Sequence, residues 1–475
     1  MAEVVLAATH EVALPPHEVY ELFGARSGVS WLFDAQCDAV RTGAPVTLTL
    51  PPGSLGGERV QILGRITKAV PGRLVQIAHD HPWAGCIRVL IRPNKRGGSL
   101  VSVTGDLDQR GLDWVMRRRG WVIPDSADGT VHRVGLLTSK TGPGAVFTVA
   151  SEYMAELALE EINEDGGLQG RRVELLVGDD QTNPSQAVSE ARRLIDSGCR
   201  TIIAGVTSAS FTAVADALAT RGLPIIHPLL NEGGRGSEFV LRWGERPLNQ
   251  VRAAADAVMK SAGGKRWYMI GNDYSWAHGA HYSGRRAISE AGAQVVGNHF
   301  VELGTADFSS VLERIEQSGA DCVLSTLVGA DEVAFERQTW DAGLRTRWET
   351  LSLVLEESAR ERIGDAAAAG IWTAFGYFEG LDTPENATLV RRYRARYGAW
   401  APPLSSLSES VYEACLLYAA AVRQGGGDPR SVASALRQSR ARMPRGLVTS
   451  DGPHVMRQEL RVARAVEGGF RVANG

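Results

Sequence analysis

Residues 135–196 read GLLTSKTGPGAVFTVASEYMAELALEEINEDGGLQGRRVELLVGDDQTNPSQAVSEARRLID. The apolar run at 133–138 predicts a strand, and apolar residues at helical spacing predict a helix over 145–167. A second strand is predicted at 173–180 and a second helix at 184–198. Short apolar strands that alternate with amphipathic helices are typical of a parallel sheet covered by helices on both faces.

The same alternation continues past this stretch and then starts again. Strands are predicted at 201–207 and 223–228, and a new series runs from the strand at 266–273 to the strand at 321–328. Two such series predict an α/β protein with two doubly wound lobes. Because ligands bind such sheets at the carboxyl ends of the strands, we expect a binding cleft there.

The first 122 residues have a different pattern. Short segments that alternate apolar and polar residues, separated by Gly and Pro, predict antiparallel strands, and residues 16–23 predict a helix. The Pro, Asp and Gly residues of 123–132 predict a linker. The chain is therefore expected to hold an α+β domain at 1–122 and an α/β module at 133–475.

Short motifs follow one another in order along the α/β module. They are T-G-P at 141–143, E-E-I-N-x-x-G-G at 160–167, D-D-Q-x-N-P at 179–184, GNDYSW at 271–276, LSTLVG at 324–329 and FEGLDTPEN at 378–386. In these motifs the module resembles the type I periplasmic binding proteins, most closely the branch that binds branched-chain amino acids, amides and urea. The resemblance implies two Rossmann-like lobes with three crossings: lobe 1 at 133–245 and 379–445, and lobe 2 at 246–378 and 446–475.

The N-terminal domain resembles a second family. LPPHEVYELF at 14–23 and GRITKAVPGRLVQIAHDHPWAG at 64–85 are similar to segments of the START-like helix-grip superfamily of polyketide cyclase type. That family closes its cavity with a long C-terminal helix, and the equivalent stretch here, about 109–119, is short.

Thr141 and Gly142 open the turn TGPGAVF at 141–147, which follows a strand and precedes a helix. We interpret this turn as one that presents a helix N-terminus to a polar ligand. A plain strand–helix turn fits as well. A dinucleotide-binding turn fits less well, because the third glycine of that fingerprint is missing.

Two further candidates follow strands of the first series. Ser208 lies in GVTSASF, where the resemblance implies a hydrogen bond to the polar head of the ligand; the structural alternative is a helix N-cap. His227 ends LPIIHP, where relatives place a polar contact, although a lone histidine is often structural. Leu229 stands where some amide-binding relatives carry a hydroxyl, so this sequence departs from their pattern.

Three candidates belong to the second series. Tyr274, at the end of a strand, offers a flat apolar wall and one hydroxyl to a small polar solute. Thr326, together with Gly329, ends the next major strand and is expected to line the cleft. Glu356 is expected to meet a ligand ammonium or amide, or else to be solvated beside Glu357.

The sequence predicts no cofactor, no metal and no catalytic residue. His79 and His81 share one face of a strand, but a third metal ligand has no evident source. The sequence contains no G-x-S-x-G elbow, no H-E-x-x-H and no phosphate-binding loop. We therefore predict a protein that is not an enzyme; the alternative is a cyclase-like catalyst in the N-terminal domain.

Charge and hydropathy limit the partners. The net charge is about −3 and the one dense basic run is Arg117–Arg119, which does not predict nucleic-acid binding. No run of about 18 apolar residues predicts a membrane span. The start MAEVVLAATHEVALPP lacks the pattern of a secretory signal, and five scattered cysteines suit a reducing compartment, so we predict a cytoplasmic location.

These expectations combine into a functional hypothesis. A small polar solute, such as an amide, urea or an amino acid, binds between the lobes of a cytoplasmic ligand sensor. The alternative is the substrate-binding component of an ABC-type importer. The expected partners are the solute, a regulatory protein or an ABC transporter, and a second copy of the chain in a homodimer.

Overall fold

The computed structural model describes residues 4–24, 34–50, 60–95, 97–108, 110–112, 114, 130–234, 237–450 and 456–473. The chain divides into two compact units: residues 1–126 with 140–142 and 397–402 form the first, and the remaining residues form the second. The Arg117–Arg119 run and residues 123–129 of the predicted linker lie outside the described residues. In the part of the chain that the structure describes, no helix combines the length and apolarity needed to cross a membrane.

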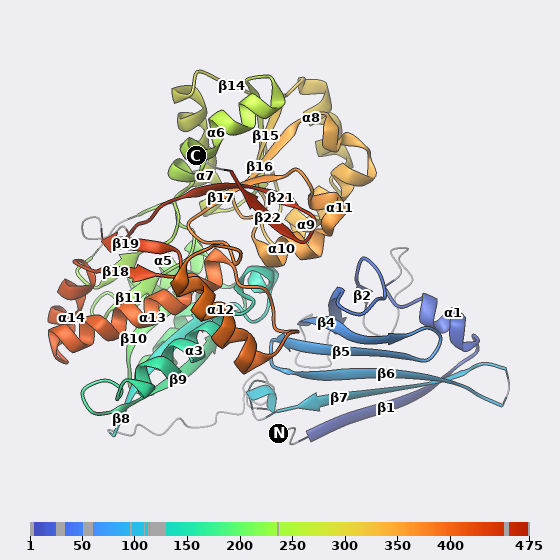
Figure 1. Cartoon of the computed structure of the whole chain (residues 1–475), viewed down its shortest axis with the longest axis horizontal. Helices are drawn as coiled ribbons and strands as arrows, with labels where there is room; N and C mark the ends of the chain where they lie inside the picture. Colours follow the sequence, from blue (N-terminus) through green and yellow to red (C-terminus); the bar gives the residue numbers. More distant parts are fainter. Residues whose placement is uncertain are drawn as a thin grey trace. The chain divides into compact units, whose positions relative to one another are not determined.

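The first unit is a curled antiparallel sheet of seven strands in the order β1-β7-β6-β5-β4-β3-β2 (Figure 1). Its elements are β1 (Val4–Val12), α1 (Pro16–Glu21), β2 (Ala35–Gln36), β3 (Pro45–Leu50), β4 (Val60–Val70), β5 (Leu74–His81), β6 (Gly85–Pro93) and β7 (Ser99–Leu107). Alternate residues of β5, including Val75 and Ile77, are buried in the core, as the period of a one-faced strand requires. The predicted antiparallel strands are confirmed.

The first lobe of the second unit contains a parallel sheet in the order β12-β11-β10-β8-β9. Its strands and helices are β8 (Val131–Thr138), α3 (Ser151–Glu164), β9 (Arg172–Asp179), α4 (Pro184–Asp196), β10 (Cys199–Gly205), α5 (Ser208–Ala217), β11 (Ile225–His227) and β12 (Val240–Arg242). Every residue of β8 after Val131 is buried, as expected for a strand with helices on both faces. The predicted α/β lobe is confirmed, with β8 beginning two residues earlier than expected.

The helix predicted over 145–167 is wrong at its start. A short 3-10 helix, η1 (Pro143–Thr148), comes first, and α3 begins only at Ser151. Ala150 adopts a left-handed conformation with φ of 68°, which interrupts the helical path. Thr148 fixes this interruption, because its hydroxyl donates a 2.6 Å hydrogen bond to the Ser139 carbonyl at the end of β8.

The second lobe contains a seven-stranded sheet in the order β14-β13-β15-β16-β17-β21-β22. Its elements are α6 (Pro247–Ala262), β13 (Arg266–Asn272), α7 (Ser275–Glu290), β14 (Gln294–Val301), α8 (Ser309–Ser318), β15 (Cys322–Thr326), α9 (Ala330–Asp341), η2 (Leu344–Thr346), β16 (Glu349–Ser352), α10 (Glu357–Ile363), α11 (Asp365–Ala368), β17 (Trp372–Phe375), β21 (Arg461–Val466) and β22 (Gly469–Val472). The first five strands are parallel, as predicted. The C-terminal hairpin of β21 and β22 adds antiparallel strands to this sheet, which the strand–helix alternation did not predict.

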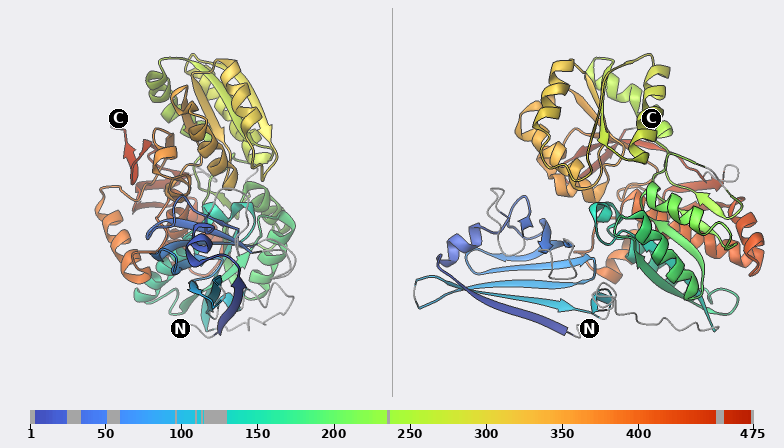
Figure 2. Two further views of the ribbon diagram at one scale, coloured as in Figure 1. Left: turned by 90° about the vertical axis from the view of Figure 1, so that its right-hand side faces the viewer. Right: turned by 180° about the vertical axis from the view of Figure 1, so that it is seen from behind.

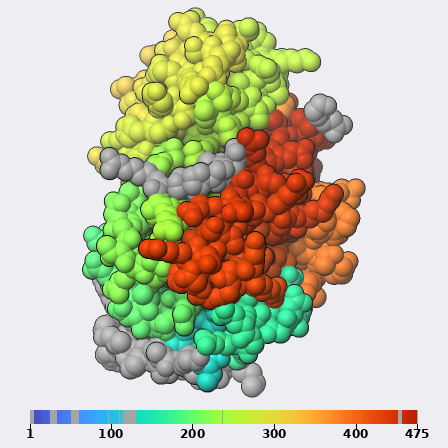
Figure 3. Space-filling view, turned by 90° about the vertical axis from the view of Figure 1, so that its left-hand side faces the viewer, coloured from blue at the N-terminus to red at the C-terminus, as the bar shows by residue number. Residues whose placement is uncertain are grey.

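Residues 384–457 return to the first lobe before the final hairpin. They contribute α12 (Pro384–Tyr397), α13 (Ser406–Gly425), α14 (Pro429–Leu436) and a small antiparallel sheet of β18 (Arg440–Met443), β19 (Gly446–Ser450) and β20 (Met456–Arg457). In space-filling view these orange and red residues cover the lower lobe and continue upward against the yellow-green lobe (Figure 3). The crossing predicted at residue 446 falls between β18 and β19, which pair with each other.

Three segments cross between the lobes (Figure 2). A buried ionic cluster joins them. The three segments follow β12, β17 and β20, and they contain Glu245, Gly376 and Gln458 respectively. Oε1 of Glu245 accepts hydrogen bonds from the Gly376 N–H at 3.1 Å and from Arg445 Nη1 at 3.2 Å, and Arg445 also donates to Gln458. Arg445 contacts two carboxylates of α13, Glu409 and Glu413. We call Glu245, Glu409, Glu413 and Arg445 the hinge cluster.

Candidate functional site

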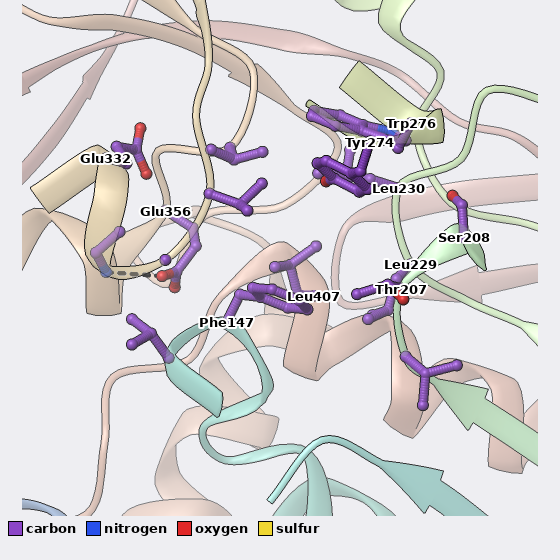
Figure 4. Close-up of a pocket in the computed structure, with 16 residues that line it drawn as sticks. Phe147, Thr207, Ser208, Leu229, Leu230, Tyr274, Trp276, Glu332, Glu356 and Leu407 are labelled. Atoms are coloured by element: carbon purple, nitrogen blue, oxygen red, sulfur yellow. Dashed lines mark hydrogen bonds between the residues drawn. The ribbon is translucent and has the colours of Figure 1, made fainter. Parts of the chain in front are cut away.

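A cavity lies between the two lobes of the second unit (Figure 4). It contains about 530 Å³ of space between protein atoms, part of which is open to solvent. The lining residues are Val146, Phe147, Val206, Thr207, Ser208, Leu229, Leu230, Tyr274, Trp276, Val328, Gly329, Glu332, Val354, Glu356, Ala359 and Leu407. Most of these side chains are apolar, so the few polar ones fix which solute groups the cavity accepts.

The first lobe presents the amino end of α5 to the cavity. Thr207, not Ser208, is the N-cap of this helix, because its hydroxyl accepts the Ser210 N–H at 3.3 Å. Ser208 is therefore available to a ligand. Its side chain is only 6% exposed, and its hydroxyl has no hydrogen-bond partner among the described residues. The first N–H groups of a helix also lack acceptors within the helix, so this end of α5 is suited to bind an anionic or strongly polar group.

Tyr274 and Trp276 form an aromatic wall on the second lobe. Tyr274 is the residue before α7 and has an extended backbone conformation. The two ring centroids are 6.2 Å apart and the planes lie 29° from parallel. Burial, with a smaller contribution from the negative charge of Glu232, raises the pKa of the Tyr274 hydroxyl, so it remains a neutral hydrogen-bonding group.

Two carboxylates of the second lobe also line the cavity, and we call Glu332 and Glu356 the cleft carboxylates. Glu356 caps α10: its carboxylate accepts the Ser358 N–H at 2.8 Å and the Ala359 N–H at 2.7 Å. Glu332, on α9, accepts a hydrogen bond from Ser352. Each residue is 1% exposed. Figure 4 shows both carboxylates on the side of the cavity opposite Ser208.

Burial dominates the electrostatics of this pair. It raises the pKa of Glu356 to about 7, although the Ser358 and Ala359 N–H groups lower it. It raises the pKa of Glu332 well above its usual value, and the like charges of Glu336 and Glu356 raise it further. Both carboxyl groups therefore hold a proton more tightly than exposed glutamates do, unless a cation lies beside them.

The apolar lining closes the space between the polar ends. Phe147 and Leu407 lie on the side opposite the aromatic wall in Figure 4, and Leu229 lies near Thr207. Gly329 brings the second lobe close to the first: a Cβ atom there would lie 2.6 Å from the Pro143 carbonyl oxygen. Its φ of 60° with ψ of −126° also favours glycine. The position therefore requires glycine both for its conformation and for the close approach.

The structure brings Ser208, Tyr274 and Glu356 together in this cavity, but not the other four predicted residues. His227 is fully buried, donates from Nε2 to the Val206 carbonyl at 2.9 Å, and stacks on Phe211 with ring centroids 4.4 Å apart. Thr326 is fully buried beside His281 at 2.9 Å. Alternate residues of a strand point to opposite faces of the sheet, and the side chains of His227 and Thr326 point into the protein and not into the cavity.

Thr141 and Gly142 lie in the turn before η1 and do not line the cavity. Gly142 has φ of 83°, so its role in the turn is conformational. Val146 and Phe147, from the same TGPGAVF segment, are the residues that line the cavity. The TGPGAVF segment therefore correctly indicated part of the cavity lining, but Thr141 and Gly142 are not the residues that line it.

Sequence reasoning missed Glu332, Trp276 and Phe147. Glu332 lies in the first turn of α9, where acidic residues are common because they complement the helix dipole. Its position three residues after Gly329 was the available signal, since Gly329 itself ends the LSTLVG motif. Trp276 is part of the GNDYSW motif that pointed to Tyr274.

His79 and His81 of the first unit are buried, whereas His10 and His17 are exposed. His79 Nδ1 lies 2.8 Å from the Trp83 carbonyl oxygen, and burial lowers the pKa of His79 to about 4. Within the described ranges, no group of three or more His, Cys, Asp or Glu side chains is placed to hold a metal ion. All five cysteines lie in the described residues, and none of them forms a disulfide bond.

Comparison with known proteins identifies the second unit. Residues 132–469 match the model of the family described as "Periplasmic binding protein". The chain belongs to this family. It is a family of non-enzymatic solute-binding proteins, and membership in it confirms the prediction of a protein that is not an enzyme. The predicted type I periplasmic-binding-protein lobes are confirmed, whereas the antiparallel sheet of the first unit remains unidentified in type.

Several binding proteins are similar to this chain. A Leu/Ile/Val-binding protein homolog 3 of Brucella melitensis biotype 1 is 30% identical over 215 residues, which are 45% of this chain and 58% of that protein. A leucine-, isoleucine-, valine-, threonine- and alanine-binding protein of Pseudomonas aeruginosa is 24% identical over 66% of this chain and 84% of its own length. The chain thus spans little more than half of the first of these relatives.

Solved structures share the fold of the second unit. A branched-chain amino acid transporter substrate-binding protein of Streptococcus pneumoniae, in complex with isoleucine, superposes with a TM-score of 0.65 at 17% identity, covering 72% of this chain and 100% of that chain. A solute-binding protein of an ABC transporter from R. palustris, in complex with benzoate, gives a TM-score of 0.64 at 23% identity, covering 72% and 96%.

Proposed function

We propose that the second unit binds a small solute that has a carboxylate and an apolar body, as the solute-binding component of an ABC-type importer. The observation that carries the proposal is the buried hydroxyl of Ser208, which has no partner among the described residues and faces a largely apolar cavity. A buried polar group without a partner is costly, and a bound solute supplies the missing hydrogen bond.

The amino end of α5 favours a carboxylate as the polar head. The helix begins at Ser208, so its first N–H groups and the Ser208 hydroxyl can all donate to one acceptor group. The remaining lining is mostly Val, Leu and aromatic side chains, which favour an apolar body. Amino acids and aromatic acids, which have a carboxylate and an apolar body, fit this lining better than urea or a short amide.

The comparisons support the same two classes. The relatives are named for leucine, isoleucine and valine, and two of the solved structures contain isoleucine and benzoate. Calorimetric titration of the whole chain with isoleucine, leucine, benzoate, 4-hydroxybenzoate, acetamide and urea tests the proposal. We expect binding of at least one carboxylate and about tenfold weaker binding of that solute by Ser208→Ala.

The control is Ser289→Ala, which removes an exposed hydroxyl from the last turn of α7 and should leave binding unchanged. If no carboxylate binds, and mass spectrometry finds no small molecule that co-purifies with the chain, the proposal is wrong.

A cytoplasmic sensor is the second candidate role for the same binding event. The separate antiparallel unit in the same chain favours this role. Closure of the lobes can act on that unit only if the solute binds the open and closed states with different affinities. The absence of disulfide bonds among the five cysteines also suits a cytoplasmic location. Cell fractionation separates the roles: recovery in the cytosol supports the sensor, and recovery outside the cytosol supports the importer.

We propose that the first unit is a START-like helix-grip domain. Its strand order, with α1 between the first two strands of a curled seven-stranded sheet, supports this assignment. A fluorescent fatty acid titrated into the whole chain, with the interlobe cavity saturated by its own solute, tests it. Saturable binding is expected for a helix-grip cavity, and the absence of binding would count against one.

A further inference from the structure

The cavity contains a second carboxylate, Glu332, besides that of Glu356, which caps α10. Glu356 already accepts two backbone N–H groups of α10, whereas Glu332 accepts one hydrogen bond from a described residue, Ser352. Glu332 is 1% exposed and lines the cavity. A carboxylate with two oxygens can accept about four hydrogen bonds, so Glu332 retains acceptor capacity that faces the cavity.

Ser352 holds Glu332 in place. The backbone N–H groups of Val354 and Leu355 donate to Ser352 Oγ at 3.3 and 3.0 Å. These contacts occupy the oxygen of Ser352 as an acceptor, and its hydroxyl hydrogen is left to donate to Glu332. The Glu332 carboxylate is therefore fixed in orientation by a residue at the end of β16, and it does not move freely in the cavity.

The described lining residues bring no positive charge to these carboxylates, although Arg362, which is not a lining residue, lowers the pKa of Glu356. Among the described residues that line it, none is Lys, Arg or His, while Glu332 and Glu356 are both present. The faces of Tyr274 and Trp276 add an environment that attracts cations. On the other side of the cavity, the Ser208 hydroxyl has no hydrogen-bond partner among the described residues, which independently supports a polar ligand in the same cavity.

We infer that Glu332 is a specificity-determining residue that pairs with a positively charged group at the far end of the solute. This inference rests on the proposed function. It names the substrate class as basic amino-acid-like solutes: a carboxylate at Ser208, an apolar stem against the lining, and an amine or guanidine beside Glu332. A solute that lacks the distal cation leaves a buried carboxyl group against hydrocarbon, which weakens binding.

A matched pair of ligands tests the assignment directly. L-lysine and L-norleucine have the same head and the same four-carbon stem, and only lysine carries a terminal ammonium. Calorimetric titration of the whole chain should give binding of lysine about tenfold tighter, or more, than binding of norleucine, because a hydrogen bond to a charged partner is worth more than a neutral one. Glu332→Gln should lose this preference while it keeps its affinity for norleucine.

Two further variants control the result. Glu313→Gln changes an exposed glutamate of α8 and should leave both affinities and their ratio unchanged. Ser352→Ala should reduce the lysine preference less than Glu332→Gln does, because it releases the carboxylate without removing it. Circular dichroism confirms that each variant is folded before titration.

The outcomes separate this inference from the proposed function. Equal binding of lysine and norleucine by the wild type, or binding of benzoate or leucine in preference to both, overturns the role of Glu332 and leaves the carboxylate site at Ser208 intact. A lysine preference that survives Glu332→Gln also overturns it. Failure of every carboxylate to bind instead overturns the proposed function itself.

Discussion

The hinge cluster and the cleft carboxylates are two groups of buried acids in one unit. They differ in whether a basic side chain lies among them. In the hinge cluster, Arg445 contacts Glu245, Glu409 and Glu413 and is 3% exposed. Burial works against the charge of Arg445, yet these three carboxylates raise its pKa above the usual value. In the cleft, Glu332 and Glu356 are equally buried, and no cation is present among the described lining residues.

This difference separates a structural role from a binding role. The hinge cluster is complete without a ligand, since its arginine ties together segments that cross between the lobes. The cleft carboxylates are incomplete, because no lining residue that the structure describes carries a positive charge. Buried charges without partners are expensive, so proteins keep them where a ligand or a reaction uses them.

Removal of Arg445 should have the largest effect on stability. Arg445→Met leaves three buried carboxylates without their cation, and it should lower the free energy of unfolding by about 3–5 kcal/mol. Urea denaturation followed by circular dichroism measures the change. Adding Glu409→Gln should restore part of the loss, because burial already raises the pKa of Glu409 and the neutral amide removes one charge.

The control for Arg445 is an exposed ion pair. Arg252 and Glu290 lie 2.8 Å apart on the surface of the second lobe, and Arg252→Met should leave the unfolding curve unchanged within error. If Arg445→Met has as little effect as Arg252→Met, the hinge cluster does not stabilise the crossings as described.

The cleft carboxylates should make the stability of the ligand-free protein depend on pH. The pKa of Glu356 is about 7 in the folded protein, above its ordinary value of 4.5. A raised pKa stabilises the folded state below the ordinary value, and this contribution is lost as pH rises through the folded pKa. From pH 4.5 to 7, wild type should therefore lose up to about 3 kcal/mol relative to Glu356→Gln, which cannot ionise.

Urea denaturation of both proteins at several pH values measures this difference. A saturating cationic solute should reduce it, because a positive charge beside Glu356 lowers the folded pKa toward its ordinary value. A constant difference between wild type and Glu356→Gln across this pH range would show that burial does not hold the proton on Glu356.

The sequence predicted the lobes well, because strand and helix periods are local properties. Buried strands such as β8 are continuous apolar runs, and a run of this kind followed by a helical pattern allows few other folds. The antiparallel hairpin of β21 and β22 was not predicted, because its place in the second sheet depends on pairing with β17, about 90 residues earlier in the chain. Such long-range pairing leaves no local pattern.

The candidate site was predictable only in part, for a geometric reason. Ser208, Tyr274 and Glu356 follow strand ends, where the fold directs backbone turns toward the cleft. His227 and Thr326 are also at strand ends, but their side chains point into the sheet layers, and the sequence does not reveal which face a terminal residue takes. Glu332 was missed because an acid in the first turn of a helix is usually solvated.

The smallest predicted effects come from substitutions of Tyr274 and Ser208, which line the cavity from different lobes. These substitutions should change solute binding without changing stability. Tyr274→Ala removes part of the aromatic wall and should weaken solute binding by about 2 kcal/mol, as truncation of a buried aromatic contact does. Ser208→Ala removes one hydrogen bond and should cost about 1.4 kcal/mol, the free energy of a tenfold loss of affinity. Tyr282→Ala, on α7 with a side chain 77% exposed, should bind like wild type. Calorimetric titration with the co-purified solute ranks the three variants.

Because Tyr274 and Ser208 line the cavity and are not part of the hinge cluster, neither variant should unfold like Arg445→Met. If Tyr274→Ala and Ser208→Ala stay folded and bind like wild type, the solute does not occupy this cavity, and the contrast between a complete hinge and an incomplete cleft loses its functional meaning.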